Sequence, residues 1–326
     1  MEQTIENNQV SQEPSNEIRA KVDTSRKRTV EEQEKHDRIV KIITRTIIYI
    51  LLTIGALTCV FPFYWMIISS LKTIEEYESF VPTYFPHQIT WDAYKLAVGY
   101  SEGLFWTTLV NSLVVGFVST GASVIFTILA AYAFAKIDFK GKNLLFSILL
   151  ATMMIPGELF TITNYITTTM KFGWSDTYTI MILPFLCSIY YIYLLRNSFM
   201  SIPDSLYKAA KVDGCSDIRF LVKIMIPLAG PTIISITILK LIGTWNSYIW
   251  PQLVNSETWG LVSNWMSRCG LQGSVKDPVT GLARTIYTDY PVRMAASMII
   301  SIPLFVVFVL FRKYIMRGVS KSGIKG

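Results

Sequence analysis

The sequence predicts an all-α membrane protein with six transmembrane helices and one structured loop on the cytoplasmic side. Of its 326 residues, 51% are hydrophobic and 16% are charged, which is too apolar for an ordinary soluble domain. The hydrophobic residues gather in long runs that carry almost no charge. Because a bilayer core about 30 Å thick needs roughly 20 apolar residues of helix, such runs predict spanning helices.

The predicted spans lie at about residues 42–70, 107–134, 144–166, 178–195, 228–254 and 292–311. None of them shows the two-residue alternation of a membrane barrel strand. Residues 1–40 are rich in Glu, Gln, Asn, Ser and Lys, so we expect a disordered cytoplasmic tail before a membrane domain at residues 41–326. We interpret this tail as a solvated segment with basic anchors; a regulatory or partner-binding tail is the alternative.

The positive charges predict the orientation of the chain. With a cytoplasmic N-terminus, 22 of the 30 Lys and Arg residues fall in cytoplasmic segments, seven fall outside and Lys240 lies within a span. This bias follows the positive-inside rule. Both termini and the loop Ser201–Pro227 are therefore expected in the cytoplasm. The net charge of +7 does not indicate a nucleic-acid partner, because the basic residues follow topology rather than one face.

The sequence contains no motif for catalysis or nucleotide binding. There is no G-x-x-x-x-G-K-[ST] phosphate loop, and the two histidines, His36 and His87, fall on opposite sides of the predicted membrane. The four cysteines have neither metal-ligand spacing nor a disulfide pattern. We therefore expect no catalytic residue, metal or cofactor on this chain. The energy for any uphill transport must then come from another chain or from an ion gradient.

The loop Ser201–Pro227 has the pattern of two short helices joined by a tight turn. Pro203 suits the first turn of a helix, and Asp213-Gly214 is a turn signal in which glycine supplies a positive φ. Ser216 can cap the second helix, and Pro227 is expected to end it. A rigid polar loop between two spans can transmit a movement of a soluble motor protein to the membrane helices.

This loop resembles the EAA loop of bacterial ATP-binding cassette importer permeases. The resemblance rests on K-A-A-x-x-D-G from Lys208, followed by I-x-I-P-L with Pro227 thirteen residues after Gly214. Further segments resemble the maltose-type, carbohydrate-uptake branch: FPFYWMIISSLK (61–72), NSLVVG with AAYAFAK (111–136), MIPGE (154–158), GTWNSYIWP (243–251) and RGVSKSGIKG (317–326). Together they cover about residues 40–326.

The resemblance implies a type I importer permease fold in the bacterial cell membrane, with the loop as a cytoplasmic coupling helix. The implied coupling residues are Lys208, Ala209, Ala210, Asp213, Gly214 and Pro227. The implied partners are a second permease subunit in a heterodimer, two cytoplasmic ATP-binding cassette ATPases, an extracytoplasmic sugar-binding protein and membrane lipid. ATP and Mg would bind to the ATPase subunits, while this chain would form half of a sugar or oligosaccharide path.

The candidate path residues are polar or aromatic groups inside the spans, because such groups suit the C–H faces and hydroxyls of sugars. They are Glu158, Lys240, Trp245, Asn246 and Tyr248. In the alternative interpretation, Trp245 packs between helices and Asn246 fixes a helix–helix contact. Lys240 would alternatively pair with a carboxylate on the partner subunit or on an acidic sugar.

Two features depart from the family pattern. Lys208 stands where the family usually has Glu, so a salt bridge expected from that carboxylate must be absent or reversed in sign. The outer loop at residues 255–290 is also longer than expected. Two alternative functions remain open: an importer permease for a non-sugar solute such as an amino acid, glycerol phosphate or peptide, and a stand-alone secondary carrier.

Overall fold

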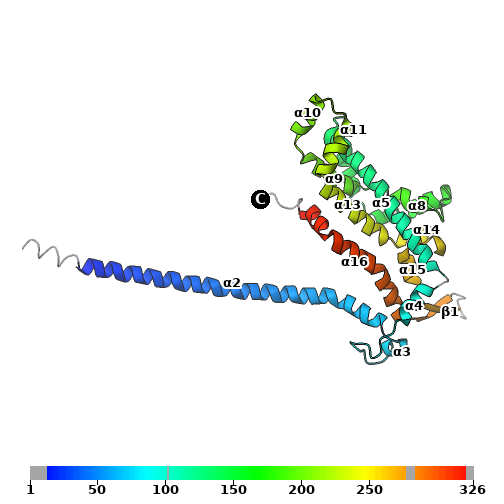
Figure 1. Cartoon of the computed structure of the whole chain (residues 1–326), viewed down its shortest axis with the longest axis horizontal. Helices are drawn as coiled ribbons and strands as arrows, with labels where there is room; N and C mark the ends of the chain where they lie inside the picture. The colour runs from blue at the N-terminus through cyan, green and yellow to red at the C-terminus, as the bar shows by residue number, and fades with distance from the viewer. Residues whose placement is uncertain (1–12, 101–102, 277–282, 321–326) are drawn as a thin grey trace, which may run out of the picture. The chain divides into compact units, whose positions relative to one another are not determined.

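The computed structural model describes residues 13–100, 103–276 and 283–320 (Figure 1). The chain forms two compact units, Met1–Trp65 and Met66–Gly326. The described part of the first unit belongs to helix α2 (Glu13–Ser70), whose last residues fall in the second unit.

Helix α2 begins at Glu13, so the structure differs from the predicted disordered tail over residues 13–40. These residues include many Glu, Lys, Arg and Gln, which have high helix propensity, and they continue directly into the first apolar span. Residues 1–12 of the predicted tail lie outside the described residues. The segment Arg38–Ser70 is long and apolar enough to cross a membrane.

The second unit contains two further continuous helices that can cross a membrane, α5 (Leu104–Lys136) and α16 (Tyr290–Ser320). The other candidates are bent pairs of helical segments: Lys142–Thr152 meets Gly157–Lys171 at 87°, Tyr178–Phe185 meets Ile189–Met200 at 47°, and Asp217–Leu228 meets Gly230–Trp245 at 80°. The third pair differs from the predicted span at 228–254, because it begins within the predicted loop Ser201–Pro227 and ends at Trp245. By length and composition, the described residues therefore contain three continuous candidate spans, or up to six if each bent pair crosses as one.

The bends occur at prolines and glycines, where a helix loses a hydrogen bond or a side chain. The predicted break at Pro156-Gly157 is confirmed, because Pro156 has an extended ψ of 131° between the two segments. Pro184 lies in a 3-10 turn before the second bend. The third bend lies at Ala229, directly before Gly230 and Pro231.

The bent spans are built from short helices. The first pair has α6 (Lys142–Thr152), a 3-10 turn (Gly157–Phe160), α7 (Thr161–Tyr165) and a π-helical turn (Ile166–Lys171). The second has α8 (Tyr178–Ile182), a 3-10 turn (Leu183–Phe185) and α9 (Ile189–Met200). The third has α11 (Asp217–Phe220), a π-helical turn (Leu221–Met225), α12 (Ile226–Leu228) and α13 (Gly230–Trp245).

The remaining helices connect these segments, and several of them lie at the two ends of this unit. Helix α10 (Asp204–Val212) lies beside α11 at one end, and α4 (Asp92–Gly99) and the strand β1 lie at the opposite end (Figure 1). The others are α3 (Ile74–Tyr77), α14 (Ile249–Val254), a 3-10 turn (Glu257–Trp259) and α15 (Val262–Arg268).

Helix α5 forms the centre of the bundle and packs against α9, α13 and α15. Small and hydroxyl side chains, among them Ser112, Ser119 and Ser123, are buried along it, as membrane helices that pack closely require. At Gly116 an added Cβ would lie 3.3 Å from Leu241 Cδ1 of α13, so only glycine allows this approach without displacing a neighbour. The prediction that small residues in the second span serve close packing is confirmed at this position.

The expected all-α fold carries one β-hairpin, which lies within the long outer loop predicted at residues 255–290. Strand β1 (Leu271–Lys276) pairs antiparallel with β2 (Ala283–Thr288), and Ser274 is opposite Thr285. Outside the hydrocarbon core, the backbone can satisfy its hydrogen bonds between strands instead of within a helix. The hairpin therefore adds to the helical membrane fold without contradicting it.

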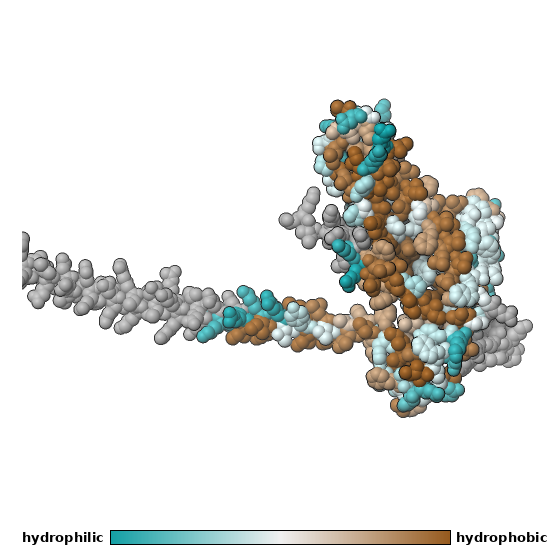
Figure 2. Space-filling model, viewed as in Figure 1, coloured by the Kyte–Doolittle hydropathy of each residue, from teal (hydrophilic) through white to brown (hydrophobic). Residues whose placement is uncertain are grey.

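The surface of the second unit is largely apolar along its helices, and hydrophilic residues gather at the α10–α11 end (Figure 2). On α5, for example, Phe117 is 65% exposed and Ile125 is 60% exposed. Exposed large apolar side chains along a helix of this length face lipid or a second membrane subunit. This distribution supports a membrane position for the unit.

Candidate functional site

Helices α10 and α11 form the loop that the sequence predicts between two spans, and the local structure matches most of that prediction. Pro203 directly precedes α10, and Gly214 has φ +70° in the turn after it. The Ser216 hydroxyl accepts a hydrogen bond of 3.4 Å from the Arg219 amide and caps α11. Helical structure continues past Pro227 to Leu228, because this proline lies at the start of α12, where its missing N–H is tolerated.

Lys136, the last residue of α5, makes hydrogen bonds to the beginning of α10. Its ammonium donates to the Ile202 carbonyl at 3.0 Å and to Asp204 Oδ1 at 2.6 Å. The Lys136 side chain is only 4% exposed. The hydrogen bond from Lys136 and its positive charge hold the pKa of the Asp204 carboxyl below its usual value.

Asp217 joins three parts of the chain through one carboxylate oxygen. Asp217 Oδ1 accepts from the Tyr207 hydroxyl of α10 at 2.9 Å and from the Tyr132 hydroxyl of α5 at 3.2 Å. Lys211 Nζ of α10 lies 3.0 Å from the same oxygen, and its hydrogen bond with Asp217 raises the pKa of Lys211. The two loop helices are therefore tied to each other and to α5.

The two faces of α10 have different surroundings. Ala210 is 8% exposed and belongs to a core cluster that includes Phe199 of α9 and Phe220 of α11. On the outer side, Lys208, Ala209, Asp213 and Gly214 are exposed. Two apolar side chains stand out beside them, since Val212 is 88% exposed and Ile218 is 76% exposed. Of the six predicted coupling residues, Ala210 thus serves internal packing, whereas four present an open surface.

A cavity of about 450 Å³ lies deeper in the bundle, between α5, α13 and the broken span of α8 and α9. Hydroxyl-bearing and aromatic side chains line much of it: Ser119, Phe185, Ser188, Tyr191, Thr244, Ser247 and Trp250. Lys240 also lines it and donates a hydrogen bond of 2.8 Å to the Phe185 carbonyl. This volume falls in the range of ligand pockets, roughly 300–1,000 Å³.

The structure brings one of the five predicted path residues, Lys240, into the cavity. Trp245 packs between helices, since it is 8% exposed and its indole N–H donates to the Ile300 carbonyl of α16 at 3.2 Å. Asn246 and Tyr248 are exposed on the segment after α13, and Glu158 is exposed at the first bend. These four do not line the described cavity, and their part in a path remains a prediction.

Sequence reasoning missed several residues of the cavity. Thr244 and Ser247 follow Lys240 at spacings of four and seven, which would place them on one face of a regular helix. The sequence pattern could therefore have predicted them together with Lys240. Ser119, Phe185 and Tyr191 come from other spans, and no local pattern distinguishes them from packing residues. Only the packing of α5 and the bend before α9 place them there.

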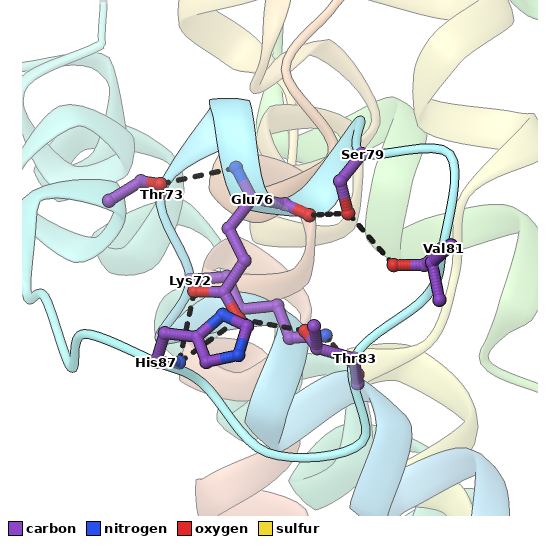
Figure 3. A network of polar contacts seen from close by, with 7 residues as sticks. All are labelled: Lys72, Thr73, Glu76, Ser79, Val81, Thr83 and His87. Carbon is purple, nitrogen blue, oxygen red and sulfur yellow. Dashed lines mark hydrogen bonds and ion pairs between the residues drawn. The ribbon is translucent and has the colours of Figure 1, made fainter.

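The loop after α2 is held by a network around Glu76 (Figure 3). The Glu76 carboxylate accepts from the Thr83 hydroxyl at 2.7 Å and from the His87 amide at 3.0 Å, and the Lys72 ammonium donates to the Thr83 carbonyl. Burial raises the pKa of Glu76, but the hydrogen bonds from Thr83 and His87 outweigh it and leave this pKa lowered. The network presents exposed aromatic residues, of which Phe80 is 102% exposed.

The sequence of the bundle, the α10–α11 loop and the cavity helix α13 matches a known family. The model of the binding-protein-dependent transport system inner membrane component family matches residues 123–321, which is more than half of the chain. The chain belongs to this family. It is therefore a membrane-embedded component of a transport system, and the family is one of permeases, not of enzymes.

Several curated permeases match over nearly their whole length. An arabinooligosaccharides transport system permease protein of Halalkalibacterium halodurans is 30% identical, over 87% of this chain and 99% of its own length. A polygalacturonan/rhamnogalacturonan transport system permease protein of Bacillus subtilis is 28% identical, over 86% and 97%. An sn-glycerol-3-phosphate transport system permease protein of Yersinia pestis is 29% identical, over 84% and 95%.

A solved structure agrees with the fold of this permease. It is the crystal structure of a bacterial ABC transporter involved in the import of the acidic polysaccharide alginate, and the matching chain has 26% identity and a TM-score of 0.70. The match covers 85% of this permease and 97% of that chain. The predicted importer permease fold is thereby confirmed.

Proposed function

We propose that this permease forms half of the translocation path of an ATP-driven, binding-protein-dependent importer of oligosaccharides. The observation that carries the proposal is the α10–α11 loop, which projects an exposed surface while Lys136 and Asp217 fasten it to α5. Two of the curated relatives are named for arabinooligosaccharides and for polygalacturonan or rhamnogalacturonan, which supports a saccharide as the solute.

In this proposal a separate cytoplasmic ATPase contacts the loop, and its conformational change displaces the loop. Val212 and Ile218 supply apolar contacts for a groove on that partner, and Lys208 supplies a positive charge. Because Lys136 and Tyr132 belong to α5, movement of the loop must move α5 as well. The same helix contributes Val115 and Ser119 to the cavity. A displacement of the loop would therefore move the residues of α5 that line the path.

The proposed assembly contains a second permease subunit, two ATPases that bind ATP and Mg, and an extracytoplasmic binding protein. The exposed apolar face of α5 fits both lipid and the second permease. The Glu76 loop and the hairpin region offer a surface for the binding protein on the outer side. Both termini are placed in the cytoplasm, since that orientation obeys the distribution of Lys and Arg.

Substitution of Gly214 tests the coupling role. Gly214→Val is expected to lower binding-protein-stimulated ATP hydrolysis by about tenfold, because a β-branched residue at φ +70° costs about 1–2 kcal/mol and its side chain points into open space. The matched control is Gly141→Val in the other cytoplasmic loop, where φ is +81° and the surroundings are equally open. An equal loss of stimulated ATP hydrolysis in both variants, or no loss in either, would contradict the proposal. Uptake of solute by this chain alone, without ATP, would contradict it too.

A second candidate function is import of glycerol phosphate. The permease of Yersinia pestis named for sn-glycerol 3-phosphate favours it, and so does the cation at Lys240. Uptake of labelled glycerol phosphate and of labelled oligosaccharides by the same reconstituted assembly separates the two candidates.

A further inference from the structure

The cavity around Lys240 carries a positive charge that the described part of the chain does not neutralise. Its lining contains no Asp or Glu, and no carboxylate lies within salt-bridge distance of Lys240 among the described residues. The hydrogen bond of the Lys240 ammonium lies on the exposed side of the cavity. An ammonium within a membrane-spanning segment is costly unless a counter-charge or water compensates it. The cavity is thus arranged to favour an anion from outside the chain.

The local geometry leaves part of the Lys240 ammonium available. The group has three N–H donors, and one of them reaches the Phe185 carbonyl at 2.8 Å. That carbonyl lies at the end of the 3-10 turn where the helical span breaks before Ser188, so it lacks the partner that a continuous helix would supply. Lys240 is therefore held in position by one bond while two donors remain for the cavity.

Neutral polar groups surround Lys240 in the cavity. Thr244 lies one turn further along α13, Ser247 follows the end of that helix, and Ser119 and Tyr191 line the cavity from α5 and α9. Hydroxyls suit the many hydroxyls of a saccharide, and a lysine suits a carboxylate, with which it forms a charge-assisted hydrogen bond. The combination fits a ligand that is both a polyol and an anion.

We propose that this cavity selects for acidic saccharides and that Lys240 binds the uronate carboxylate as the solute passes. The proposal rests on the proposed function, because it names the class of oligosaccharide that the importer carries. The alternative role for Lys240 is purely structural, as a cap for the carbonyl of Phe185 at the broken helix.

The test uses the full assembly in proteoliposomes with ATP inside and liganded binding protein outside. The probes are a galacturonate trisaccharide, its carboxyl-reduced neutral counterpart and sn-glycerol 3-phosphate, each radiolabelled. Lys240→Met is expected to raise the KM for the acidic trisaccharide about tenfold, as the loss of a hydrogen bond between charged groups does, with a much smaller effect on the neutral one. Lys240→Arg should restore most of the affinity.

A matched control is Lys171→Met, which removes an exposed lysine outside the cavity and should leave all KM values unchanged. Equal losses for the acidic and neutral trisaccharides in Lys240→Met would assign the residue a structural role and overturn the inference. Uptake of the neutral trisaccharide alone would overturn it too, while leaving import of oligosaccharides intact. Uptake of glycerol phosphate alone, or of none of the probes, would overturn the proposed saccharide function itself.

Discussion

At the scale of single residues, Asp217 is the position where several contacts of the α10–α11 loop meet. Its carboxylate receives Tyr207 and Lys211 from α10 and Tyr132 from α5. Both tyrosines lie partly or wholly inside the core cluster at this end of the bundle. The Asp217 side chain thus sets the position of α10 relative to α5, the helix that lines the cavity.

Removing this carboxylate should loosen the loop without unfolding the bundle. Asp217→Ala is expected to lower the local stability of α10 by about 2 kcal/mol. Two tyrosine hydroxyls and the Lys211 ammonium lose the carboxylate that accepts their hydrogen bonds, and the partial exposure of this group limits the loss. Hydrogen exchange of the α10 amides measures this change, and Ser205→Ala, at an exposed position of the same helix, is the control. Unchanged exchange in Asp217→Ala would show that packing of Ala210 and Phe220 alone holds the loop.

At the scale of elements, the loop after α2 depends on Glu76, a carboxylate whose pKa is lowered. The Thr90 amide donates to the Leu71 carbonyl at 3.0 Å and closes the loop, and Glu76 fills its centre. A lowered pKa means that the folded loop prefers ionised Glu76. The stabilisation is therefore fully present above the unfolded pKa of about 4.3 and is lost as the pH falls through the lower folded value.

This argument predicts a pH-dependent opening of the loop. Between pH 7 and pH 3, the His87 amide should lose protection from hydrogen exchange, after correction for the intrinsic rate, because its acceptor Glu76 becomes protonated. In Glu76→Gln the protection should be weaker at pH 7 and should no longer vary with pH. Protection that falls with pH equally in both proteins would place the titrating group elsewhere.

At the scale of the whole molecule, α5 connects the α10–α11 loop with the cavity. The helix runs from Ser119 at the cavity to Lys136 at the loop, which is about 25 Å at 1.5 Å per residue. Its close approach to α13, which carries Lys240, depends on Gly116. Transport in this arrangement requires that α5 and α13 remain packed while the loop moves.

A larger residue at the contact of α5 and α13 should destabilise the whole bundle. Gly116→Leu is expected to cost about 1–3 kcal/mol, since Leu241 Cδ1 already lies 3.3 Å from the position of an added Cβ. Thermal unfolding in detergent, followed by size-exclusion chromatography, measures the loss. Gly121→Leu, on the same helix with open space around its Cβ, should unfold close to wild type. Similar losses in both variants would contradict a specific contact at Gly116.

The sequence by itself determined the features that depend on neighbouring residues. The apolar runs, the break at Pro156-Gly157, the turn at Gly214 and the cap at Ser216 were all predictable, because span length, proline geometry, positive φ and capping involve residues within a few positions. The hairpin and the continuous helix from Glu13 were not predicted. The polar composition of residues 13–40 was interpreted as disorder, although many of these residues have high helix propensity.

Tertiary structure alone decided which distant residues meet. Tyr132 and Asp217 are 85 positions apart, and Lys240 and Phe185 are 55 apart, so no local pattern pairs them. The same holds for Trp245, whose aromatic character suggested a path residue but whose indole donates to a carbonyl of α16. Hydropathy is a property of each segment, whereas a binding cavity arises only where bent segments pack and leave space between them.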